Sequence, residues 1–105
     1  QKGMTSVTAA SKTTYTAVAG DQIVVDTVAN PVTITLPSSP AVGDEVTIMD
    51  GSASNGFATN NVTVGRGGSK IEGATSDDTL ATNNQCVTLV FANAAKGWLY
   101  KSTNQ

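Results

Sequence analysis

Eight carboxylates are the main side chains of this sequence that could act as acids or bases, because the chain has no histidine. A glycosidase needs two carboxylates about 5 to 10 Å apart across a sugar, but nothing in the spacing of these acids selects a pair. Most of them fall in turns, where an aspartate bonds its own backbone. We therefore expect no hydrolase site and predict that the chain is not an enzyme. The acids are Asp21, Asp26, Asp44, Glu45, Asp50, Glu72, Asp77 and Asp78.

Metal and nucleophilic chemistry is restricted further by the single cysteine, Cys86. Without histidine, zinc sites of the usual Cys/His kind and Ser-His-Asp or Cys-His catalysis are excluded. Residues 50–56 are oxygen-rich like a calcium loop, but they hold one carboxylate and no Glu closes the loop. The glycine-rich residues 65–70 lack the spacing of a phosphate-binding loop. The sequence therefore predicts no catalytic residue, no metal site and no cofactor.

The charge of the chain is low. Charged residues make up 13% of the 105 residues, and the net charge is -2, whereas an average soluble domain has about 25% charged residues. The cations are scattered apart from Arg66 and Lys70, so no basic patch indicates nucleic acid. No apolar stretch approaches the roughly 20 residues of a membrane span. We expect neither nucleic-acid binding nor membrane insertion. Because the chain begins with Gln1, we also expect it to be part of a longer protein.

Threonine alternates with Val, Ile or Leu in several short segments. Residues 32–36 read Val-Thr-Ile-Thr-Leu, and residues 46–48 and 62–64 repeat the pattern. Such alternation is typical of half-buried strands, whose outer surface here would consist largely of hydroxyls and amides. The expected strands, with turn residues between them, are 13–17, 22–26, 32–36, 45–50, 61–64, 70–72, 86–92 and 98–102.

These strands define the expected fold and its boundaries. About eight short strands at this spacing predict an all-β, small antiparallel β-sandwich or jelly-roll-like domain over residues 13–105. Residues 65–68 read as a hairpin turn into the segment 70–72. Residues 1–12 are polar and without a period, so we expect an extended N-terminal arm or linker.

Three apolar residues point away from the expected core. Val24, Val90 and Leu99 fall on the opposite face of their strands from the neighbouring apolar residues. Another subunit could cover them, which makes them candidates for an interface between subunits. Local loops could also cover them, and the residues alone leave both possibilities open.

Two aromatic residues have uncertain positions between core and surface. A lone tryptophan in a small β domain is more often the largest core residue than a sugar platform, so we expect Trp98 in the core. Phe57 lies in a loop, where it either plugs one end of the sandwich or is an exposed contact. The sequence leaves both alternatives open for Phe57.

An ordered series of short motifs runs through about residues 14–100. Their members are turn glycines, strand starts and apolar core positions. The motifs are Tyr15-Thr16, Gly20-Asp21, Thr33-Ile34-Thr35-Leu36-Pro37, Pro40, Gly43-Asp44, Val46-x-Ile48-x-Asp50, Phe57-Ala58-Thr59-Asn60-Asn61-Val62-Thr63-Val64, Ile71-x-Gly73, Val87-x-Leu89-Val90-Phe91 and Trp98. As a set they resemble the C-terminal, distal domain of bacteriophage tail fibres, which is also seen in other virion appendages of tailed phages.

The resemblance implies a small β-sandwich, usually a homotrimer, in the virion tail fibre and outside the cell. Its partners would be other virion tail proteins and a bacterial surface polysaccharide, either capsule or lipopolysaccharide, that serves as receptor. Similar segments also occur as internal fibre or baseplate spacers. The matched positions are scaffold positions, so the resemblance transfers no receptor contact.

The expected function is therefore attachment of a virus to a bacterial surface glycan. Two alternatives remain: a passive trimerising cap or spacer, and a monomeric carbohydrate-binding module of an enzyme. Any contact surface is expected in the loops 51–60, 65–69 and 76–84, because loops on a rigid sandwich carry recognition. Cations suit an acidic sugar and amides suit neutral hydroxyls. The candidate receptor contacts are Asn55, Phe57, Asn60, Arg66, Lys70 and Asn84.

Overall fold

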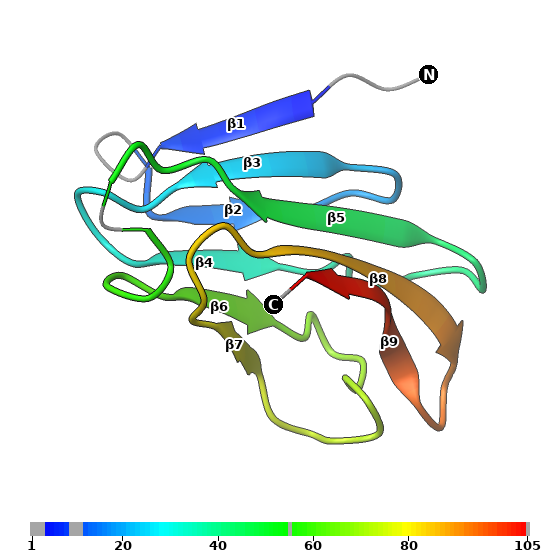
Figure 1. Cartoon of the computed structure of the whole chain (residues 1–105). Coiled ribbons are helices and arrows are strands. Elements are labelled where there is room, and N and C mark those ends of the chain that lie inside the picture. The colour runs from blue at the N-terminus through cyan, green and yellow to red at the C-terminus, as the bar shows by residue number, and fades with distance from the viewer. Residues whose placement is uncertain (1–3, 9–11, 55, 105) are drawn as a thin grey trace.

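Two β-sheets enclose the core of the protein (Figure 1). The structure, a computed structural model, describes residues 4–8, 12–54 and 56–104, which contain nine strands. No helix occurs among these residues, so none is long and apolar enough to cross a membrane. The strands are β1 (Met4–Thr8), β2 (Thr14–Thr16), β3 (Gln22–Asp26), β4 (Val32–Thr35), β5 (Glu45–Asp50), β6 (Val62–Gly65), β7 (Asp78–Leu80), β8 (Cys86–Asn93) and β9 (Gly97–Asn104). The all-β prediction is confirmed.

The first six strands alternate between the two sheets. One sheet has the order β1-β3-β5-β8-β9 and the other has the order β2-β4-β6-β7. As a result β1, β3 and β5 are parallel neighbours, and so are β2, β4 and β6. A parallel pair requires a crossover, and here a strand of the opposite sheet makes it.

The prediction of an antiparallel sandwich is therefore wrong in part, because both sheets are mixed. Antiparallel pairing is confined to the last strands, where β8 pairs with β5 and β9, and β7 pairs with β6. The turn signals at Gly20 and Gly43 were correct, but these turns lead from one sheet to the other instead of closing hairpins. Sequence shows where a strand ends, and it does not show which sheet the next strand joins.

Two strands were not predicted. β1 lies within the segment that the sequence indicated to be an arm or linker, and it pairs with β3 along its whole length. Residues 1–3 and 9–11 of that segment lie outside the described residues. β7 lies in an expected loop. Among the side chains whose burial is described, Val7 is the buried apolar residue of β1 and Leu80 that of β7, and one residue is too little for a visible period.

One predicted strand is absent. Residues 70–72 form no strand, and Ile71 makes only isolated bridges to Ala74 and Trp98. The predicted hairpin at residues 65–68 is also wrong, because β6 pairs with β7 and not with the segment 70–72. The last two expected strands, 86–92 and 98–102, are present and pair antiparallel as β8 and β9.

The core consists of the inward-facing residues of both sheets and one large aromatic at each end. Ile23, Ile48 and Leu89 of one sheet and Ile34 and Val64 of the other are fully buried. Trp98, the second residue of β9, and Phe57, from the connection between β5 and β6, are also fully buried. The core prediction for Trp98 is confirmed. Burying such an aromatic removes roughly 200 Å² from water, so these two residues contribute much of the apolar burial at the ends.

Gly97 offers a test of how tightly the Trp98 end is packed. Its φ is +72°, and a Cβ there would collide with the carbonyl oxygen of Lys70, which accepts the N–H of Trp98 at 2.7 Å. We predict that Gly97→Ala lowers the free energy of unfolding by roughly 3 kcal/mol or more, measured by urea titration.

The matched control is Gly43→Ala. Gly43 also has a positive φ, +93°, but no atom lies within 4 Å of a Cβ built there. Only the conformational cost of about 1 to 2 kcal/mol applies. Equal losses for the two variants would contradict the packing described for Gly97.

Candidate functional site

The loops form two groups at opposite ends of the sheets. Because β3 is parallel to β5 and β4 is parallel to β6, the loops 27–31, 51–61 and 81–85 share one end of the sheets, here called the Phe57 end. The loops 17–21, 36–44, 66–77 and 94–96 share the other, here called the Trp98 end. In Figure 1 these ends lie on the left and on the right. The three loops predicted to form a contact surface are therefore divided between both ends.

The candidate receptor contacts are divided in the same way. Asn60 and Asn84 lie at the Phe57 end, whereas Arg66 and Lys70 lie at the Trp98 end. Asn55 lies outside the described residues. The structure does not bring these side chains together, and a single site made of all of them is not possible in one chain.

At the Phe57 end, Asp50 holds the loops together. Its carboxylate accepts the backbone N–H groups of Ser52 at 2.9 Å, Asn84 at 3.0 Å and Phe57 at 3.2 Å. Burial opposes ionisation, but these donors and the Ser52 hydroxyl outweigh it and lower the pKa of Asp50. The segment that has the composition of a calcium loop therefore uses its carboxylate to bind its own backbone.

Asn60 and Phe57 also have structural roles at this end. The Asn60 side chain donates to the carbonyl oxygens of Thr27 at 2.8 Å and Val28 at 3.2 Å, which joins the connection 51–61 to the connection 27–31. The Phe57 side chain is fully buried. Of the two alternatives left open for Phe57, the plug is what the structure contains, and its side chain offers no exposed contact.

At the Trp98 end, the cations are only partly available to a ligand. The guanidinium of Arg66 donates to the carbonyl oxygen of Ser69 at 3.0 Å, and its Nε lies 3.7 Å from a carboxylate oxygen of Asp77. The backbone of Lys70 pairs with Trp98. Arg66 therefore stabilises its own turn, and a weak exposed ion pair of this kind contributes little to stability.

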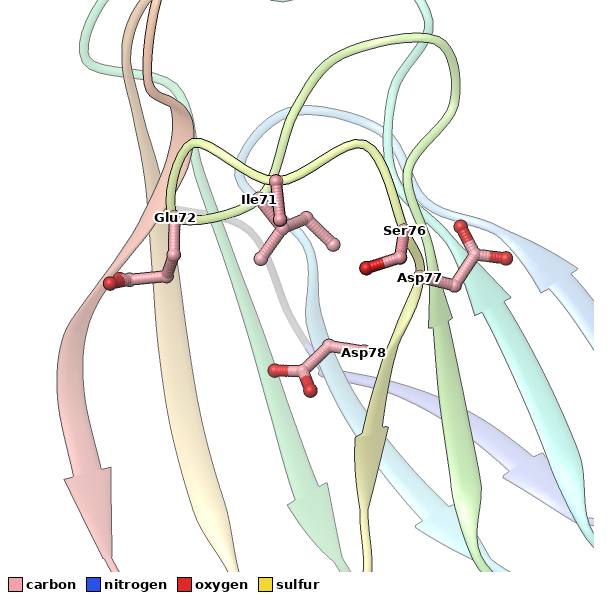
Figure 2. Close-up of a pocket in the computed structure, with 6 residues that line it drawn as sticks. Ile71, Glu72, Ser76, Asp77 and Asp78 are labelled. Atoms are coloured by element: carbon pink, nitrogen blue, oxygen red, sulfur yellow. The ribbon is translucent and has the colours of Figure 1, made fainter.

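A small cavity of about 180 Å³ at this end contains three carboxylates, those of Glu72, Asp77 and Asp78. Figure 2 shows them pointing in different directions, with Asp78 toward the cavity. Each accepts hydrogen bonds from the chain: Glu72 from the N–H of Tyr100, Asp77 from the N–H of Arg66, and Asp78 from the Tyr100 hydroxyl. Glu72 and Asp78 hold the connection between β6 and β7 against β9, and Asp77 closes that connection on itself. Among the described residues no group of three metal-binding side chains occurs.

A second cavity of about 270 Å³ lies between β7 and β9, at the side where the two sheets end. Its polar lining includes Thr79, Thr82 and Gln85, together with the half-buried Tyr100. Burial, the hydrogen bond to Asp78 and the negative charges nearby raise the pKa of Tyr100 above its ordinary value. Tyr100 is therefore a neutral hydrogen-bond donor at any physiological pH.

The outer face of the five-stranded sheet carries the three candidates for a trimer interface. Val24, Val90 and Leu99 alternate with buried residues of β3, β8 and β9, and all three are half-buried. Val90 and Leu99 are direct partners in the sheet, and Val24 is the partner of Met49. The structure brings the three onto one face, and no loop among the described residues buries them fully.

The outer face of the four-stranded sheet is a grid of threonines, which sequence analysis did not single out. Buried apolar residues alternate with these threonines along β4, β6 and β7. The register aligns four of them in one row and two in a second row, where Gly65 follows. The Thr-x-Thr patterns were visible in the sequence, but their alignment depends on the parallel pairing. The threonine grid consists of Thr14, Thr33, Thr63 and Thr79 in the first row and Thr16 and Thr35 in the second.

Comparison with known proteins adds no assignment. No protein-family model matches the chain, and no curated protein matches it. The similarity to tail fibre domains stays a prediction from the motifs, and the function must be argued from the surfaces described above.

Asp50 provides a test of the Phe57 end. We predict that Asp50→Asn lowers the free energy of unfolding by about 1 to 3 kcal/mol at neutral pH, because one oxygen acceptor is replaced by an amide. Since folding lowers the pKa of Asp50, its contribution is complete above the unfolded value of about 4 and is lost as the pH falls through the folded value. As the pH is lowered, the free energy of unfolding of the variant should therefore decrease less than that of the wild type.

The control is Asp26→Asn, since the Asp26 carboxylate accepts one backbone N–H, that of Val28, at 2.9 Å. Urea titrations at several pH values should give a smaller loss for this variant. An unchanged acid profile in Asp50→Asn would contradict the role given to Asp50.

Proposed function

We propose that this chain is a non-enzymatic attachment domain of a virion tail fibre, assembled as a homotrimer, that binds a glycan on the surface of a bacterium. The observation that carries the proposal is the difference between the two outer sheet faces. One face has apolar side chains that a single chain leaves half-exposed, and the other has uncharged hydroxyls. The first suits contact with further copies, and the second suits a polar ligand.

The first face favours self-association on energetic grounds. Val24, Val90 and Leu99 would each gain about 25 cal/mol per Å² of apolar surface removed from water. Between Val24 and the pair Val90 and Leu99 lie Thr47 and Thr88, whose hydroxyls bond to each other at 3.0 Å, so these two polar groups satisfy each other. An ion pair between Glu45 and Lys101 at 2.8 Å lies beside Leu99. The face therefore has two apolar groups, one at Val24 and one at Val90 and Leu99, with a threonine pair between them whose hydroxyls are already bonded.

A trimer would also make weak sugar contacts useful. Each hydrogen bond to a hydroxyl contributes about 1 kcal/mol net, so a single small surface binds weakly. Three identical surfaces on one fibre raise the overall avidity without any new contact. Attachment through repeated weak contacts is the physical reason to display such a domain in three copies.

Light scattering after size exclusion tests the assembly. We expect the wild type to have the mass of three chains of 10.6 kDa. Leu99→Lys places a charge in the proposed interface and should shift the mass toward the monomer. Val42→Lys is the control, because Val42 is 75% exposed in a loop and lies outside the interface. A wild type that is monomeric at all concentrations would contradict the trimer.

Flow cytometry with the labelled chain on bacteria that display different capsules and lipopolysaccharides tests attachment. We expect the chain to bind a subset of strains, and polysaccharide extracted from those strains should compete. Binding to none of them would support the passive cap or spacer and contradict attachment. Release of reducing sugar from the capsule would contradict the non-enzymatic role.

A further inference from the structure

We propose that the threonine grid is the glycan-binding surface of this chain, and that its ligand is an uncharged, extended polysaccharide segment that lies across the strands. This inference rests on the proposed attachment function and replaces the loops as the site of contact. It is carried by three observations: the register of the grid, the free hydroxyls on it and the absence of charge.

The register gives the grid a regular repeat in two directions. Thr14, Thr33 and Thr63 are partners on three parallel strands, and Thr79 on β7 continues the row. Neighbouring strands are about 4.8 Å apart, so the row presents a hydroxyl and a methyl group at that interval. This interval is close to the length of one pyranose unit in an extended glycan. A glycan across the strands would therefore meet an equivalent threonine at each sugar.

The second row widens this surface. Thr16 and Thr35 lie two residues beyond Thr14 and Thr33 on the same strands, which separates the rows by about 6.6 Å. Gly65 continues the second row without a side chain, and a Cβ there would lie 3.1 Å from the Thr35 hydroxyl oxygen. Gly65 is buried, and a larger residue there would crowd the Thr35 hydroxyl.

The grid hydroxyls are free to bind a ligand. Within the described part of the chain, no hydrogen bond involves the side chain of any of the six threonines. The contrast is on the opposite sheet, where Thr47 and Thr88 satisfy each other at 3.0 Å. A threonine pairs a hydroxyl with a methyl, as a sugar pairs hydroxyls with C–H groups, so both kinds of contact are available to a saccharide.

Charge decides between neutral and acidic ligands. None of the six grid positions is ionisable, and the neighbouring Asp78 is directed to the Tyr100 hydroxyl on the inner side of the sheet. An acidic polysaccharide would be desolvated here without a cation to compensate it. Arg66 and Lys70 lie at the Trp98 end, beyond the last residue of β6. The face therefore favours a neutral glycan.

The first row leads to the larger cavity. Thr79 ends the row on β7 and also lines the cavity of about 270 Å³ together with Gln85 and Tyr100. A terminal sugar could enter this cavity while the rest of the glycan lies on the grid. The glycan chain would then run along the first row of threonines from β2 to β7, with its terminal sugar at the cavity.

A biosensor with the chain of residues 1–105 immobilised tests the proposal. The probes are three neutral polysaccharides, dextran, mannan and xylan, and one acidic polysaccharide, polygalacturonate. We expect the wild type to bind a neutral polymer with little dependence on salt. The double variant Thr33→Val/Thr63→Val removes two central hydroxyls and should bind on the order of tenfold more weakly. The variant Thr33→Ser/Thr63→Ser keeps these hydroxyls and should retain most of the affinity.

The matched control is Thr59→Val/Thr75→Val, which makes the same change at two exposed loop threonines outside the grid and outside the proposed interface, and should leave binding unchanged. Retained binding in the grid variant would overturn the inference and leave the attachment function standing. Binding of polygalacturonate alone, lost in Arg66→Gln/Lys70→Gln, would overturn it in favour of the loops. A changed mass of the grid variant would mean that this face contacts another copy. No binding of any of the four polymers would overturn the inference, and the flow cytometry on bacterial strains decides separately whether the attachment function stands.

Discussion

The constraint on which the rest of the structure depends is the parallel pairing of strands that alternate between the two sheets. It pairs β1 with β3 and β3 with β5 in one sheet, and β2 with β4 and β4 with β6 in the other. Because β2, β4 and β6 run in one direction in one sheet, residues far apart in the sequence come into line, such as Thr14, Thr33 and Thr63. The same winding leaves each sheet with one buried and one outer face. An antiparallel arrangement of the same strands would reverse the direction of every second strand and would separate the loops differently. The surfaces available for binding therefore follow from the winding of the chain.

The winding also explains why the loops are poor candidates for a ligand. The loops that follow β2, β3, β4, β5 and β7 each connect the two sheets, so they cross an open end of the core and must be fastened there, whereas the loops 66–77 and 94–96 connect neighbouring strands of one sheet. Asp50, Asn60 and Asp78 do this through hydrogen bonds to other segments of the chain. The polar groups of these three side chains hydrogen-bond to the chain itself, whereas the hydroxyls of the threonine grid make no such bonds within the described part of the chain. We therefore place ligand binding on a sheet face and not on the loops, because the loops close the ends of the core.

Local features of this fold could be predicted from the sequence, and non-local ones could not. Val32-Thr33-Ile34-Thr35 identifies β4, because alternation within one segment depends only on that segment. The partner of β4 depends on the winding, which no single segment encodes. In the same way, Asn60 reads as an exposed amide, but its hydrogen bonds go to Thr27 and Val28, more than thirty positions away. The apolar positions of Val24, Val90 and Leu99 could be placed on a second face, but not on one common surface.

The central claim is that the two outer sheet faces have different partners, other copies on one and a glycan on the other. Two thiols can report on these faces: the native Cys86, half-buried in β8 beside Met49, and one introduced by Thr63→Cys in the grid. The most direct measurement is the rate at which maleimide alkylates each thiol, with and without a bound neutral polysaccharide. The account predicts that Cys86 reacts slowly in the assembled chain regardless of the polysaccharide, and that the grid thiol reacts quickly until the polysaccharide covers it. Protection of Cys86 by the polysaccharide, or of the grid thiol by assembly alone, would contradict it.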